Sequence, residues 1–156
     1  AEARVDAIER ILKPATSASE LRVRLRLFAD EFVDVHVREP DLCKIIHRDV
    51  ERMTAIGEEV FRQSFFKLFM KFVEFLKSAE KAKLTKKLKD AELVASLIFG
   101  ALIHLLNTEP HRALLGLPSI REPKYREEVL VAWTDLAVAT LGQHPASSSP
   151  AGSQES

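Results

Sequence analysis

The sequence has little of what stabilises small secreted or β-rich proteins. It contains one cysteine, Cys43, and five glycines in 156 residues. A lone cysteine excludes an internal disulfide framework and is typical of a reducing compartment. No signal peptide opens the chain, so we expect a cytoplasmic protein. Few turn-forming residues and few alternating runs also argue against a β fold.

Net charge and long apolar runs are missing as well. Basic residues (Lys and Arg) and acidic residues (Asp and Glu) both number 23, so no net field would draw this chain to nucleic acid or to an anionic membrane. We therefore expect no salt-dependent, sequence-specific binding to DNA by this chain alone. No run of about 18 uncharged apolar residues, the length that a membrane helix needs, occurs in the sequence, so we expect no membrane partner.

The sequence shows no arrangement of residues that is typical of catalysis or cofactor binding. Cys43 has no identifiable base, and neither a glycine-rich phosphate loop nor a Gly-x-Ser-x-Gly motif occurs. The five histidines form no Glu-x-x-His or His-x-x-x-His pair, which are the spacings that place two metal ligands on one helix. These observations predict no enzyme, no cofactor and no metal site.

What the sequence does contain is apolar residues at helical spacing, which make up 46% of the chain. Ser17 with Glu20 forms a capping box, and Asp90 is a second predicted N-cap. The pattern predicts an all-α bundle of about six helices, over residues 2–13, 17–39, 41–53, 56–81, 90–107 and 123–141. We expect one domain over residues 1–142 and a disordered tail over residues 143–156, which are rich in Ser, Pro and Gly.

The predicted helix over residues 90–107 is too apolar for a helix with one solvent face. It is either a fully buried core helix or half of a four-helix bundle between two subunits. We favour the second, because a helical domain of this size has little interior in which to hide it. The prediction is a homodimer through the last two helices. Its interface residues would be Ala95, Ser96, Gly100, Ala101, Val129, Trp133, Leu136 and Ala137.

Phenylalanines at helical spacing form a second cluster, on the predicted helices over residues 17–39 and 56–81. They either fill a core or line a pocket for an apolar ligand, and the sequence leaves both open. His104 is either a hydrogen-bonded core or interface group or a polar contact for such a ligand. The candidate ligand-binding residues are Phe28, Phe32, Ile46, Phe61, Phe65, Phe69, Phe99 and His104.

Two stretches carry a family resemblance. Residues 19–28 lie in a long predicted helix, and residues 38–49 contain Pro40 followed by the pair Ile45–Ile46. In this order they resemble the regulatory domain of TetR-family transcription regulators of the AcrR-like branch, in which a long helix ends at a proline and a short helix with an aliphatic pair follows. The stretches 90–107 and 125–141 are similar to the two dimerisation helices of that domain.

The resemblance covers residues 1–142 and implies the regulatory half of a presumed bacterial repressor, which senses a small hydrophobic ligand and dimerises. Residues 1–13 resemble the helix that links the two halves of such a regulator. The family's helix-turn-helix would then be missing, and the chain would be a fragment that reaches DNA only through that N-terminal domain. The alternative is a helical interaction or adaptor domain without a ligand. A helical enzyme with a phenylalanine-lined pocket is the least favoured reading of the sequence.

Overall fold

The computed structural model describes residues 2–52 and 54–142, and this part of the chain contains helices and no strand. The prediction of an all-α fold is confirmed. The residues predicted to form a disordered tail, 143–156, lie outside the described part. The elements are α1 (Glu2–Ile11), α2 (Ala18–Arg38), α3 (Pro40–Glu51), α4 (Ala55–Val60), the π-helix η1 (Phe61–Phe66), α5 (Lys67–Lys81), α6 (Ala91–Asn107), α7 (Glu109–Leu114) and α8 (Pro123–Leu141).

The predicted helix starts have the expected caps. The Ser17 hydroxyl accepts a hydrogen bond from the Glu20 N–H at 3.1 Å, and Asp90 caps α6 by accepting from the Leu93 N–H at 2.9 Å. The Glu20 carboxylate bonds to the N–H of Thr16, at 2.8 Å, instead of completing the usual capping box on Ser17. Each cap satisfies N–H groups that have no partner within the helix, and so fixes where that helix begins.

Two predicted segments differ from the structure in detail. The long helix predicted over residues 56–81 has that extent, but it consists of α4, η1 and α5, with a π-helical segment at its centre. Between the helices predicted over residues 90–107 and 123–141, where no helix was predicted, the structure has the short helix α7. A helix of six residues is too short for apolar periodicity to reveal.

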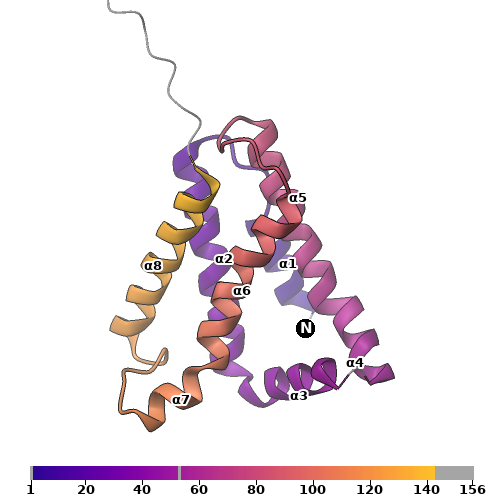
Figure 1. Ribbon diagram of the computed structural model, residues 1–156, viewed down its shortest axis with the longest axis vertical. Coiled ribbons are helices and arrows are strands. Elements are labelled where there is room, and N and C mark those ends of the chain that lie inside the picture. Colours follow the sequence, from indigo (N-terminus) through magenta and orange to yellow (C-terminus); the bar gives the residue numbers. More distant parts are fainter. Residues whose placement is uncertain (1, 53, 143–156) are drawn as a thin grey trace, which may run out of the picture.

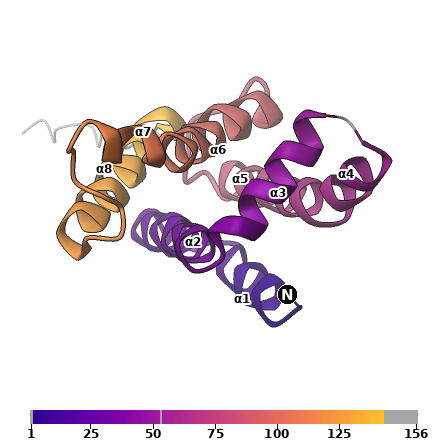
Figure 2. The same cartoon turned by 90° about the horizontal axis from the view of Figure 1, so that it is seen from below.

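Four helices form the body of the fold. In Figure 1, α2, α5, α6 and α8 run roughly along the long axis, and α3 crosses the lower end between α2 and α4. Figure 2 shows α6 and α8 on one side of the bundle, with α1 next to α2 on another. Among these four helices, the most extensive contacts are those of α8 with α2 and of α6 with α5 and α8. None of the helices in the described part is long and apolar enough to cross a membrane.

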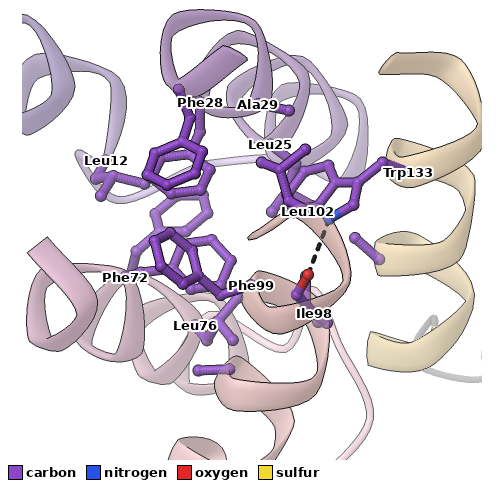
Figure 3. Close-up of a cluster of buried hydrophobic side chains, with 14 of the residues drawn as sticks. Leu12, Leu25, Phe28, Ala29, Phe72, Leu76, Ile98, Phe99, Leu102 and Trp133 are labelled. Atoms are coloured by element: carbon purple, nitrogen blue, oxygen red, sulfur yellow. Dashed lines mark hydrogen bonds between the residues drawn. The ribbon is translucent and has the colours of Figure 1, made fainter. Parts of the chain in front are cut away.

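The core lies where these four helices meet. Figure 3 shows Phe28 from α2, Phe72 from α5, Phe99 from α6 and Trp133 from α8 in one continuous cluster. The Trp133 indole N–H donates to the Ile98 carbonyl at 2.9 Å, so its one polar group is satisfied although the side chain is buried. This bond fixes α8 against α6.

Candidate functional site

Phe99 is the centre of an aromatic cluster that joins four elements. Its ring centroid lies 5.0 Å from that of Phe32 and 5.7 Å from that of Phe28, both on α2. It lies 5.3 Å from Phe65 of η1 and 6.3 Å from Phe69 of α5. These separations are those of rings in direct contact, so the structure brings together five of the eight candidate ligand-binding residues.

The cluster is not buried evenly along its length. Phe28 and Phe99 are at most 2% exposed, and their rings pack against one another and against Phe72. This end is a filled core. Phe65 and Phe69 are only half-buried, so the cluster reaches the surface at the junction of η1 and α5. If apolar contacts are available to a ligand anywhere in this cluster, they are at this second end.

Of the remaining three candidates, the structure describes the side chain of one, His104. His104 is exposed on α6, whereas Phe99 on the same helix points inward, so the structure does not place this histidine among the rings. The side chains of Ile46 and Phe61 lie outside the described part.

Sequence reasoning missed His36 as a member of the cluster. Its ring lies 4.5 Å from that of Phe32, and its Nδ1 is 2.9 Å from the Phe32 carbonyl oxygen. The signal was the four-residue spacing from Phe32, which puts both side chains on one face of α2.

The outer surface of α6 and α8 is the second candidate site. Three residues of the predicted interface, Ser96, Gly100 and Leu136, are exposed there, and Ala101 is half-buried. The sequence did not single out Leu93 and Leu97, which are 56% and 62% exposed on the same surface of α6. We call these residues, with the exposed Ala132 of α8, the outer face.

Four residues predicted for the interface lie instead in the core of the chain. They are between 0% and 6% exposed and pack against helices of the same chain: Ala95, Val129, Trp133 and Ala137. The correction has a simple cause, since α6 and α8 both carry apolar residues on their buried and on their exposed sides. Periodicity alone could not say which side its own chain covers.

Ion pairs between α2 and α8 fix how α8 presents its outer face. Arg126 bonds to Asp30 at 2.6 Å, and Arg26 bonds to Glu127 at 2.5 Å. The hydrogen bond to Arg26 lowers the pKa of the Glu127 carboxyl, and the same bond raises the pKa of Arg26. Both pairs connect the side of α8 opposite to its outer face with α2, and so favour the observed orientation of α8.

The reactive and metal-binding chemistry of the described part is sparse. Cys43 is a half-buried free thiol, and burial together with the nearby Glu39 carboxylate raises its pKa. A thiol with a raised pKa stays protonated at neutral pH and is a poor nucleophile. Among the described residues, no group of three or more His, Cys, Asp or Glu side chains could hold a metal ion.

A groove of about 700 Å³ runs between α1 and α5. Charged side chains from both helices line it, among them Asp6, Glu9, Lys71 and Glu74. None of the candidate ligand-binding residues lines it, and it does not have the mostly apolar lining predicted for a ligand pocket.

No protein family, curated protein or solved structure was found to match this chain. A function must therefore be inferred from the two candidate sites, the half-buried end of the aromatic cluster and the outer face. The first has the apolar chemistry to contact a small hydrophobic molecule. The second has the chemistry to pack against a helix.

Proposed function

We propose that this chain is the regulatory domain of a TetR-family transcription regulator, which dimerises through the outer faces of α6 and α8 and senses a small hydrophobic ligand. DNA recognition then belongs to a separate helix-turn-helix domain. The observation that carries the proposal is the exposure of Leu93, Leu97 and Leu136 on two adjacent, antiparallel helices. A self-complementary surface of two helices pairs with its own copy to give a four-helix bundle.

Gly100 supports this proposal because nothing within the subunit requires a glycine at this position. A Cβ added at Gly100 would meet no atom within 4 Å outside its own helix backbone. A glycine within a helix costs roughly 0.5–1 kcal/mol relative to alanine. A helix from a second subunit that approaches closely at this point accounts for the missing side chain.

A glycine substitution tests the dimer without disturbing the subunit. Gly100→Leu adds bulk at an exposed position of the outer face, where a second subunit would lie, and it raises helix propensity. We expect it to weaken the dimer about tenfold or more in sedimentation equilibrium, which corresponds to about 1.4 kcal/mol. Lys77→Leu, which adds the same side chain at an exposed position of α5, is the matched control and should leave the dimer unchanged. Equal association of both variants would contradict the proposal.

The ligand part of the proposal rests on the half-buried end of the aromatic cluster. Phe65 and Phe69 would contact an apolar ligand, and η1 would form part of the wall. Single π-helical turns inside α-helices are frequent at functional sites, because they break the regular packing of side chains. The filled end around Phe28 would hold this wall against α2 and α6.

Coupling to DNA binding would pass through the contact between α1 and α2. Arg24 of α2 donates to the carbonyl oxygens of Ile11, at 2.9 Å, and of Arg10, at 3.2 Å, at the end of α1. It also bonds to Glu20 within α2 at 2.7 Å. A ligand that shifts α2 would therefore move α1, and couplings of this kind typically amount to ~1–3 kcal/mol.

The melting temperature tests the ligand part directly. A panel of aromatic and lipid-like compounds should contain at least one that raises the melting temperature of the wild-type chain. The same compound should raise that of Phe65→Ala much less. If no compound stabilises the chain, or if Phe65→Ala responds as the wild type does, the site is not at this end of the cluster.

A further inference from the structure

Three leucines at the end of α7 are unusually exposed. The exposed fractions are 84% for Leu114, 74% for Leu115 and 44% for Leu117. Single exposed apolar residues are common on protein surfaces, but three within four positions form a patch that marks a contact site. We call these three residues the leucine knob.

The backbone of the leucine knob is fixed by a Schellman motif. Gly116 has a φ of +66°, the Leu117 N–H donates to the Arg112 carbonyl at 3.0 Å, and the Gly116 N–H donates to the Ala113 carbonyl at 3.1 Å. These are the two hydrogen bonds with which such a motif closes a helix C-terminus. The leucines are therefore held on a defined turn.

Side chains brace the same turn against the rest of the chain. Glu109 accepts hydrogen bonds from the Ser119 hydroxyl at 2.6 Å and from the Ile120 N–H at 2.8 Å. The Arg112 guanidinium lies 4.4 Å above the centre of the Tyr125 ring at the start of α8. A preformed apolar surface loses little conformational entropy when it binds, so it is suited to a specific partner.

The position of the leucine knob in the fold indicates which partner it contacts. It lies in the connection between α6 and α8, the two helices of the outer face, as both Figure 1 and Figure 2 show for α7. Among the described residues, seven of the ten large exposed hydrophobic side chains belong to residues 91–141. The outer face and the leucine knob thus lie on one stretch of chain.

The number of residues that a stable interface needs also links the leucine knob to the outer face. A standard interface uses roughly 20–30 residues from each partner. The outer face has seven residues, and even the sixteen exposed residues of α6 and α8 together fall below this number. The eight exposed residues between 110 and 118 bring the number to 24.

We propose that the leucine knob is covered by a second copy of this chain, as an arm of the dimer interface beyond the outer face. This inference rests on the proposed dimer. It assigns to the end of α7 a role in holding the two subunits together, in addition to that of the outer face.

The test replaces the two most exposed leucines. In the full chain, Leu114→Glu combined with Leu115→Glu should weaken the dimer about tenfold or more in sedimentation equilibrium, with unchanged helix content by circular dichroism. Val23→Glu combined with Leu27→Glu is the matched control, since both of these apolar residues are about half exposed on α2, outside residues 91–141. The control should leave the dissociation constant of the dimer unchanged.

The outcomes separate this inference from the proposed dimer. If the wild-type chain is a dimer, Gly100→Leu weakens it and the leucine variant does not, the knob has no role in the interface and only this inference fails. If the wild-type chain is a monomer, both fail. A further arm uses phosphatidylcholine vesicles: leucine-dependent co-sedimentation with them, without an effect on the dimer, would assign the knob to a lipid surface and overturn the inference.

Discussion

Phe28 and Phe65 belong to the same aromatic cluster, but they differ in what surrounds them. Phe28 is fully buried, whereas Phe65 is half-buried at the other end of the cluster. Phe28→Ala should lower the free energy of unfolding by ~3–5 kcal/mol, because it leaves a cavity in a filled core. Phe65→Ala should cost less than half as much. Urea denaturation measures both, and equal losses would mean that Phe65 is a core residue and not part of a ligand site.

Glu20 offers a pH-dependent prediction at the junction of α1 and α2. Its carboxylate accepts hydrogen bonds from Thr16 and then from Arg24, which lowers its pKa from the ordinary 4.5 to about 2. A lowered pKa stabilises the fold fully above the ordinary value, and this stabilisation is lost as the pH falls from about 4.5 to 2. Glu20→Gln should therefore lower the melting temperature at pH 7, and the difference from wild type should shrink over that interval. A difference that does not change with pH would show that the charge of Glu20 does not act on the fold.

At the scale of the elements, the contact between α2 and α8 includes ion pairs that differ in their exposure to solvent. The Arg126 side chain is 24% exposed and bonds to Asp30 at 2.6 Å, whereas Arg22 and its partner Asp135 are 48% and 56% exposed. Arg126→Met should cost about 1 kcal/mol, and Arg22→Met roughly 0.5 kcal/mol or less, since solvent screens an exposed pair. Chemical denaturation compares the two. If Arg22→Met lowered the free energy of unfolding more than Arg126→Met, the less exposed pair would not be the one that positions α8.

Most elements could be predicted from the sequence, and the exceptions have physical causes. Long amphipathic segments such as α2 show their period clearly, and Asp90 and Pro123 mark where α6 and α8 begin. The π-helix η1 was not predicted, because a π-helical turn has the same residue types as the α-helix around it. The sequence also indicated an aromatic cluster, but His36 was not assigned to it, although its four-residue spacing from Phe32 on α2 brings the two rings together.

Buried and exposed apolar residues were hardest to distinguish from the sequence on α6 and α8. Trp133 and Ala137 were expected at an interface, yet they pack against their own chain, and the more exposed Leu97 was not singled out. An apolar residue has the same character whether its own subunit or a second one covers it. Only the arrangement of the other helices decides which, and that arrangement depends on contacts such as the bond from Trp133 to Ile98.

For the whole molecule, the proposed function depends on the outer face being covered by a second copy. Sedimentation equilibrium of the unmodified chain from about 1 to 100 μM measures this without any substitution. We predict a species of twice the 17.6 kDa chain mass throughout the upper part of this range. A single species of 17.6 kDa at every concentration would contradict the proposed dimer, and would favour a helical interaction domain that binds another protein.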